Sequence, residues 1–407
     1  MLLYRHGCFS AIYILGLLIY AVVFNATPAA AQTPAPVAAP TPIDESKYLA
    51  EKLRTNAGAI SIMVSGFNTT SSFFAEDIRN VVNDLRPGGQ RALISYGEGG
   101  PHNLKDSLFL LGVHQAIVDE NNLRLVKESN PVVYGDIEER IRYVTKLYNA
   151  EFHILARRDI KNVRELNGKA VNVDLLYSQT DLVAKKIFGI LGINIKPTNY
   201  DDALAQQKLL NGEISAMVLS DGAPRESLLH LKTSDGLHFL PLDAASVPGA
   251  DFKPIRSEYL PAELSSESYP NLIPAGQSIP TVASRMVLST YNWPENGERY
   301  NRNSKFIGVF FSKIETFRHP ARHPKWREVN IAADVPGWKR FKPAQQWLDR
   351  NLSTASITPD GGTAGQQENF EKFVEQLETA TGGRPLSPGE RDALFKEFRK
   401  SMEKRSQ

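Results

Sequence analysis

Cysteine is almost absent from this chain, because Cys8 is the single cysteine among its 407 residues. Cys8 lies within an apolar N-terminal segment, so the remainder of the chain cannot form a disulfide within itself. A chain of this length can nevertheless bury enough apolar surface to be stable through its core alone. We therefore expect a globular body without disulfide bonds.

A strong charge of either sign is absent as well. Lys and Arg together number 47 and Asp and Glu 45, which gives a formal net charge of +2. Residues 313–342 are locally rich in Lys and Arg and contain two Trp, a pattern that we assign to a solvated face or a surface meeting a membrane protein. The balance of charge predicts no nucleic-acid partner.

Motifs of catalysis and cofactor binding are also missing. The sequence has no nucleophile elbow, no HExxH zinc motif, no phosphate-binding P-loop and no S-x-x-K set. His319 and His323 have the spacing of two metal ligands on a helix, but Pro320 disrupts a helix there and no further ligand completes a site. The sequence thus predicts a binding protein rather than an enzyme, with no cofactor and no metal.

The longest apolar run stands near the N-terminus. Arg5 precedes an apolar stretch from Gly7 to Phe24, and small residues follow at Ala29–Ala31. This order is typical of a secretory signal peptide covering residues 1–31, although an uncleaved N-terminal anchor has a similar pattern. Both interpretations place the body of the protein in the periplasm, after an Ala/Pro-rich linker at residues 32–43.

Strand and helix patterns alternate through the body. A buried-strand pattern at residues 59–64 leads into a helix from about Phe73 to Leu85, and residues 147–193 read as strand, short helix, strand, loop and helix. Alternation of this kind favours largely parallel α/β sheets. We expect a solute-binding domain over residues 44–350.

Four polar loops follow predicted strands: residues 65–72, 97–103, 177–180 and 220–222. In open α/β sheets ligands bind beyond the carboxyl ends of strands, so these loops predict one shared cleft. The same Ser and Thr residues could instead serve only as helix N-caps. The candidate ligand-binding residues are Ser65, Asn68, Thr69, Thr70, Ser71, Gly99, Asn103, Tyr177, Ser178, Thr180 and Asp221.

Charged residues in or beside strand patterns add further candidates. Arg285 stands inside the apolar stretch 281–289, where a buried guanidinium would need a partner such as a ligand carboxylate. The alternative is that Arg285 is exposed or paired within the protein. Asp119 and Asp221 follow strand patterns and could hold an ammonium group, or could cap the turns that follow them.

Residues 351–407 combine a linker with two helical patterns. Phe370, Phe373 and Leu377 recur at helical spacing, and residues 387–390 form a capping box with proline at its first helical position. Apolar stripes of this kind need a partner. The two helices are expected either to pack on each other or on the body, or to dock onto a separate partner.

Three segments carry a resemblance to a known family. In residues 147–173, Leu147-Tyr148, His153 and Gly168-Lys169 stand in the family's LYPE-LH and DLKGK-V patterns. Residues 209–224 are similar to its L-DG-IDA turn, with Gly212 in place, and residues 273–289 to the strand that returns through its hinge. Over about residues 59–345 the chain resembles the TAXI family, the extracytoplasmic solute receptors of TRAP transporters.

The resemblance implies the α/β type II periplasmic-binding-protein fold, with two lobes, each a largely parallel sheet flanked by helices, and a helical C-terminal tail. Lobe I would comprise about residues 44–145 and 281–350, and lobe II about residues 146–280. It further implies a receptor that binds a small organic anion, carboxylate or amino-acid-like, between the lobes and delivers it to a TRAP-type membrane permease. A second hypothesis is a periplasmic sensor or scaffold that acts through its C-terminal helices.

Overall fold

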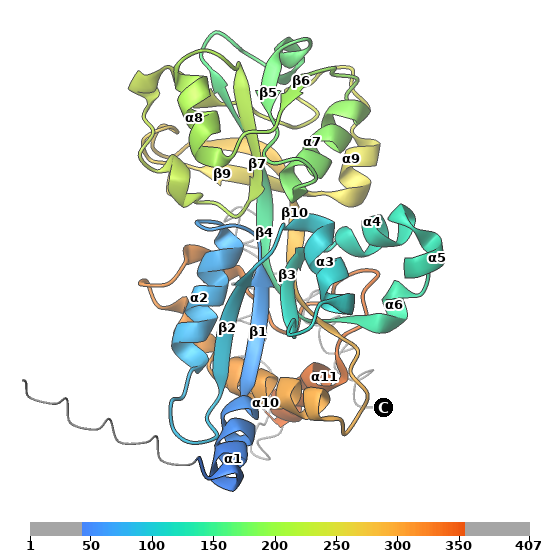
Figure 1. Ribbon diagram of the computed structural model, residues 1–407. Helices are drawn as coiled ribbons and strands as arrows, with labels where there is room; N and C mark the ends of the chain where they lie inside the picture. The colour runs from blue at the N-terminus through green and yellow to red at the C-terminus, as the bar shows by residue number, and fades with distance from the viewer. Residues whose placement is uncertain (1–42, 355–407) are drawn as a thin grey trace, which may run out of the picture. The chain divides into compact units, whose positions relative to one another are not determined.

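The computed structural model describes residues 43–354 (Figure 1). The predicted signal or anchor segment, the linker up to residue 42 and the tail from residue 355 lie outside the described residues. The chain divides into two units, residues 1–49 and 50–407, and helix α1 (Glu45–Asn56), which has no buried residue, crosses their boundary. In the described part of the chain no helix combines the length and apolar character needed to span a membrane.

A ten-stranded mixed sheet organises the second unit, in the order β2-β1-β3-β10-β4-β7-β5-β6, with β8 paired to β4 and β9 to β10. In the first lobe three parallel strands pair with one another: β1 (Ala59–Val64), β2 (Arg91–Tyr96) and β3 (Gln115–Asp119). In the second lobe three more do so: β5 (Ala170–Asn172), β6 (Lys196–Thr198) and β7 (Ala216–Asp221). The predicted α/β fold with parallel strands in two lobes is confirmed.

Two long strands run through both lobes (Figure 1). These are β4 (Ile141–Arg157) and β10 (Ser278–Tyr291), which pair with each other antiparallel. They also pair antiparallel with β7 and β3, and they carry the edge strands β8 (Leu237–Phe239) and β9 (Leu260–Ser265). The chain crosses between the lobes once in each direction, through β4 and β10. The sheet is therefore continuous across the lobes and contains both parallel and antiparallel pairs.

Helices flank the strands of both lobes. The first lobe contains α2 (Thr70–Val82), α3 (Gly100–Phe109), α4 (Asn122–Ser129), α5 (Pro131–Tyr134), α6 (Ile137–Arg140), α10 (Glu298–Ser312) and α11 (Lys342–Thr354). The second lobe contains α7 (Gln179–Ile190), α8 (Asp202–Leu210) and α9 (Lys253–Glu258). Short 3-10 segments lie at Val163–Leu166, Glu226–Leu228, Thr233–Asp235, Ile314–Arg318 and Pro324–Glu328.

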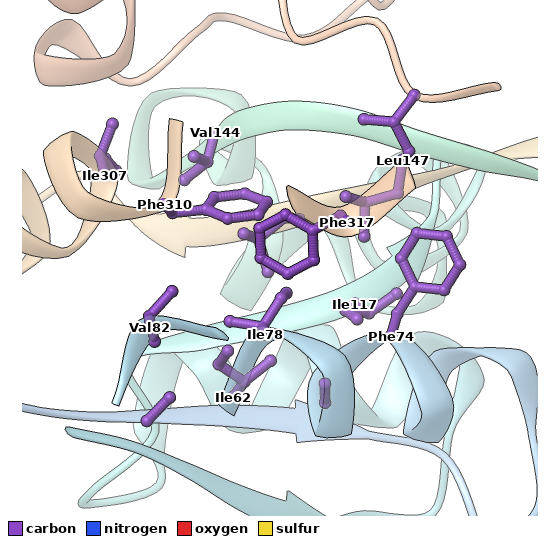
Figure 2. Packing of buried hydrophobic residues seen from close by; sticks show 14 of the residues in the cluster. Ile62, Phe74, Ile78, Val82, Ile117, Val144, Leu147, Ile307, Phe310 and Phe317 are labelled. Atoms are coloured by element: carbon purple, nitrogen blue, oxygen red, sulfur yellow. The ribbon is translucent and has the colours of Figure 1, made fainter. Parts of the chain in front are cut away.

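Each lobe has its own core. In the first lobe, side chains of α2, α10 and the segment after α10 pack together, among them Phe74, Phe310 and Phe317 (Figure 2). Trp326 is fully buried against them, with its ring centroid 4.1 Å from that of Phe74 and 4.3 Å from that of Phe317. In the second lobe Phe152 of β4 lies against α7 within a separate aliphatic cluster. Because the two lobes do not share a core, β4 and β10 are the strands about which they could move as separate bodies.

Candidate functional site

A cavity of about 350 Å³ lies between the lobes, at the carboxyl ends of the parallel strands. Its wall comes from the loops after β1, β2, β5 and β6, from the end of β7, and from Tyr148 of β4 and Met286 of β10. Parallel strands place their carboxyl ends at one edge, which is why these loops meet there. The four polar loops singled out in the sequence are brought together around this cavity.

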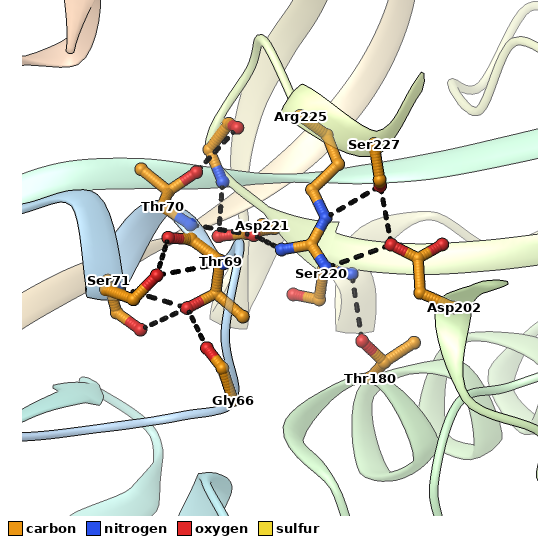
Figure 3. Close-up of polar contacts among 12 residues, drawn as sticks. Gly66, Thr69, Thr70, Ser71, Thr180, Asp202, Ser220, Asp221, Arg225 and Ser227 are labelled. Carbon is orange, nitrogen blue, oxygen red and sulfur yellow. Dashed lines mark hydrogen bonds and ion pairs between the residues drawn. The ribbon is translucent and has the colours of Figure 1, made fainter. Parts of the chain in front are cut away.

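The start of α2 forms one side of the wall. Thr69 is its N-cap: the Thr69 hydroxyl accepts from the Ser72 N–H at 3.1 Å, and the Ser72 hydroxyl accepts from the Thr69 N–H at 3.1 Å. This capping box starts the helix at Thr70, earlier than the expected Phe73. The Thr69 hydroxyl also donates to the Gly66 carbonyl at 2.9 Å, and Ser71 lines the cavity beside it (Figure 3).

Thr70 joins the two lobes. Its backbone N–H donates to Asp221 Oδ2 at 3.0 Å, and its hydroxyl donates to the Gly222 carbonyl at 2.9 Å (Figure 3). A side chain on Gly222 would come within 2.8 Å of the Thr70 methyl group and 3.0 Å of the Tyr148 ring. Only glycine therefore permits this close approach of the lobes.

The loop after β2 closes the first lobe's side of the cavity. Gly99 has a φ of +78°, and a Cβ there would lie 2.9 Å from the Ser65 hydroxyl. Both the left-handed backbone and the contact favour glycine. Asn103 is fully buried behind the loop and its Oδ1 accepts from the Gly99 N–H at 3.0 Å, so Asn103 shapes the loop and is not in the cavity wall.

The start of α7 forms the second lobe's side. Ser178 is the N-cap of α7 and accepts from the Asp181 N–H at 3.2 Å. Thr180 accepts from the Ser220 N–H at 3.1 Å, which ties α7 to β7 (Figure 3). Tyr177 lies outside the wall, with a φ of +67° and a side chain that is 59% exposed.

A charged network stands at the end of β7 (Figure 3). The Arg225 guanidinium is buried and pairs with Asp221 through one nitrogen and with Asp202 at 3.0 Å through another. Asp202 also accepts from the Ser227 hydroxyl at 2.5 Å. Both carboxylates, one at the start of α8 and one at the end of β7, are thus oriented by one guanidinium.

Burial and charge together set the pKa values in this network. Burial disfavours the charged form of Arg225, but the carboxylates of Asp221 and Asp202 outweigh it and raise the Arg225 pKa above its ordinary value. Burial would raise the pKa of Asp202, yet Arg225 and the hydrogen bonds from Ser227 and Gln206 lower it. For Asp174, burial raises the pKa and outweighs the opposing effects of the Leu175 N–H, Ser178 and Arg225.

Seven of the residues predicted from the sequence lie in the cavity wall. They are Ser65, Thr69, Ser71, Gly99, Ser178, Thr180 and Asp221. Four others stand next to the wall, namely Thr70 and Asn103, which are buried, and Asn68 and Tyr177, which are exposed. Asn68 has a φ of +57°, a conformation that Asn tolerates better than most residues.

Arg285 is placed away from this cavity. Its guanidinium lies 2.9 Å from Glu120 Oε2, and the two residues line a different cavity together with Trp338. Arg285 is therefore paired within the protein, as in the second of the two alternatives predicted from the sequence, and not with a ligand in the cavity between the lobes. Asp119 is likewise outside the wall: it accepts from the Ser284 hydroxyl and from the Asn121 N–H, which caps the turn after β3.

Several wall residues were missed from the sequence. They are Gly66, Phe67, Gly97, Glu98, Tyr148, Asp174, Leu175, Gln179, Asp201, Asp202, Ala203, Leu219, Ser220, Arg225 and Met286. The adjacent pair Asp201-Asp202 at the start of α8 was a usable signal, because Asp at that position caps a helix that follows a strand. Arg225 gave no such signal, since its role depends on partners at the start of α8 and at the end of β7.

His319 and His323 do not converge on a metal. The His323 N–H donates to Asp77 at 3.1 Å, and the His323 ring accepts from the Lys325 N–H at 3.3 Å. Within residues 43–354, no three His, Cys, Asp or Glu side chains are grouped so that they could hold a metal ion.

Comparison with known proteins identifies a similar family over part of the chain. Residues 113–296 match the NMT1-like family. This segment is less than half of the chain and includes both long strands and the whole second lobe. The match shows similarity to that family over this segment and leaves the TAXI resemblance unconfirmed.

Solved structures of binding proteins are also similar, at low identity. Rpa4515 from R. palustris with adipate has 14% identity and a TM-score of 0.42, covering 73% of this chain and 95% of that one. The alkanesulfonate-binding protein SsuA from Xanthomonas axonopodis pv. citri, bound to MOPS, has 13% identity and a TM-score of 0.39, covering 81% and 95%. The P235GK mutant of ArgBP from T. maritima has 14% identity and a TM-score of 0.39, covering 69% and 99%. Similarity at this level says nothing about the ligand of this chain.

Proposed function

We propose that the protein is an extracytoplasmic solute receptor that binds a small molecule in the cavity between its lobes. The observation that carries this proposal is the cavity itself, which has a volume of about 350 Å³ and a wall built from loops of both lobes. A ligand that contacts both walls makes those contacts only when the lobes are together, so it stabilises that arrangement. The two connecting strands, β4 and β10, provide the hinge.

The partners follow from the resemblance. The receptor would work in the periplasm and present the bound solute to a membrane permease of the TRAP type. The arrangement of the wall supports binding rather than catalysis, because its Thr69 and Ser178 hydroxyls cap helices and its buried Arg225 is held by two carboxylates. The alternative role as a sensor or scaffold depends on the C-terminal helices, which lie outside the described residues.

A ligand screen with a matched pair of variants tests the proposal. Thermal shift should identify a stabilising solute in a panel of amines, amino acids, carboxylates and sugars, and saturation at 100 times the Kd should add about 2.7 kcal/mol of stability. Small-angle scattering should show compaction with the same solute.

Ala203→Trp would place a large ring at the cavity wall, whereas Ala321→Trp would place it at an exposed site away from the cavity. The first variant should lose binding and the second should retain it. A panel without any stabilising solute, or equal binding by both variants, would contradict the receptor function.

A further inference from the structure

We propose that the solute carries a positively charged amino, amidino or guanidino group, which the carboxylates of the cavity wall bind. This inference rests on the proposed receptor function and names its ligand class. The proposed cation differs from the organic anion implied by the resemblance, because the folded chain places negatively charged side chains around the cavity.

The wall of the cavity is strongly acidic. It contains five carboxylates against one guanidinium, Arg225, and the carboxylates are Glu98, Asp174, Asp201, Asp202 and Asp221. Arg225 is shared between Asp202 and Asp221. The other three carboxylates have no Lys or Arg within salt-bridge distance in the described part of the chain. The local field therefore attracts cations and repels a carboxylate ligand.

Several of the groups that could hold an anion are already occupied. The helix starts that face the cavity offer backbone N–H groups, as the sequence predicted, but several of these donate to acceptors in the protein. The bonds are Thr70 N–H to Asp221, Ser72 N–H to Thr69, Gly99 N–H to Asn103 and Asp181 N–H to Ser178. A helix start that is capped in this way has fewer free donors for an anion.

A second observation points to a polar ligand at the same place. Tyr148 of β4 lines the cavity and is completely buried, and its hydroxyl has no hydrogen-bond partner among residues 43–354. Burial and the nearby Asp221 raise the Tyr148 pKa well above its ordinary value, so the hydroxyl stays neutral and can accept a hydrogen bond. An unsatisfied buried hydroxyl costs free energy, which a ligand N–H would recover.

The distribution of the carboxylates favours an organic cation over a metal ion. Glu98, Asp174 and Asp201 follow three different strands and Asp221 ends a fourth, and no three such groups within residues 43–354 are grouped as metal ligands. The cavity has room for roughly a dozen water-sized groups at ~30 Å³ each. Phe67 and Leu175 add apolar surface for a carbon chain between charged ends.

Two substitutions remove charge without removing structure. Asp201 caps α8 by accepting from the Leu204 N–H at 3.0 Å, and Asp201→Asn retains an equally good cap. Asp174 has a φ of +65°, a conformation that Asn also tolerates, so Asp174→Asn retains the backbone. Glu267→Gln is the control, because Glu267 is exposed, lies outside the cavity wall and pairs with no Lys or Arg in the described residues.

Calorimetry with the purified full chain would use spermidine and agmatine as cation probes, and succinate and glutarate as anion probes. We expect at least one cation probe to bind, and the double variant Asp174→Asn/Asp201→Asn to bind it about tenfold or more weakly. Glu267→Gln should bind like the natural chain.

Binding of the anion probes alone would overturn the inference and leave the receptor function standing. Equal affinity of the double variant and the natural chain would also overturn the inference, because the carboxylates would then not contact the ligand. If no solute bound, including the neutral solutes of the thermal-shift panel, the result would contradict the receptor function itself.

Discussion

The Thr70 backbone N–H donates a 3.0 Å hydrogen bond to Asp221 Oδ2, which joins the first turn of α2 in one lobe to the end of β7 in the other. Thr70 is buried, and its hydroxyl donates to the adjacent Gly222 carbonyl. The same Asp221 carboxylate pairs with Arg225. One carboxylate therefore links contact between the lobes to the charged network of the cavity.

Removing this carboxylate should destabilise the protein. Asp221→Ala leaves the buried Thr70 N–H without its acceptor and removes one partner of Arg225, at a cost of about 1–3 kcal/mol or more. Urea denaturation of the ligand-free protein measures this loss of free energy of unfolding. Asp221→Asn is the control, since its amide oxygen can still accept from Thr70. An unchanged free energy of unfolding for Asp221→Ala would mean that the lobes do not make this contact in solution.

Replacing Arg225 should destabilise the protein more than replacing an exposed arginine. Arg225→Ala leaves the half-buried carboxylates of Asp202 and Asp221 without a counter-charge, and breaking a buried pair in this way costs about 3–5 kcal/mol. Arg158→Ala, at an exposed position, should cost less than about 0.5 kcal/mol. Thermal and chemical denaturation compare the two variants, and equal midpoints would contradict the assigned role of Arg225.

His153 should make the protein less stable in acid. The ring is completely buried, with Nδ1 2.9 Å from the Glu151 carbonyl and Nε2 2.7 Å from the Tyr269 hydroxyl, and burial lowers its pKa to about 4. A lowered pKa means that the unfolded chain binds the proton more tightly. The contribution of His153 is therefore complete above pH 6.5 and is lost as the pH falls toward 4, by about 3 kcal/mol.

The variant His153→Phe isolates this effect from the carboxylates that also titrate. It should be less stable than the natural chain at pH 7, because the Tyr269 hydroxyl loses its acceptor, but its free energy of unfolding should fall less between pH 6.5 and pH 4. Urea denaturation across that pH range measures both slopes. Parallel slopes would show that the pKa of His153 is the same in the folded and the unfolded protein.

The aromatic core of the first lobe should carry much of its stability. The Phe310 side chain is completely buried, with ring centroids 5.4 Å from Phe317 and 6.1 Å from Trp326 (Figure 2). Phe310→Ala should cost about 3–5 kcal/mol through lost burial and the cavity it creates. Phe109→Ala is the matched control, because that ring is 57% exposed and should cost far less. Similar losses in both variants would contradict the packing described.

The order of elements could be predicted from local patterns. The buried-strand pattern at residues 59–64 matches β1, and residues 147–193 contain β5 and α7 in the predicted order. Periodic apolar residues, glycines at helix ends and Ser or Thr at helix starts act over a few residues, so the sequence contains them directly. The same local signals located the loops that carry Ser65, Ser178 and Asp221 in the cavity wall.

Long-range pairing could not be predicted in this way. Arg285 has the sequence context of a ligand-binding arginine, but the fold brings Glu120 to it from a separate strand end. Arg225 has no distinctive context, yet it holds carboxylates from the start of α8 and the end of β7. Pairing energy depends on distance and burial, and neither is visible in a linear pattern.

The sequence by itself determined the alternation of strands and helices, the polar loops and the absence of disulfides, because these depend on residue type and close neighbours. Only the tertiary structure decided which loops share a cavity and what charge that cavity has. Its acidity arises because Glu98, Asp174 and Asp201 are far apart in the chain but follow strands whose carboxyl ends meet between the lobes. A chain with almost no net charge thus concentrates negative charge at one place.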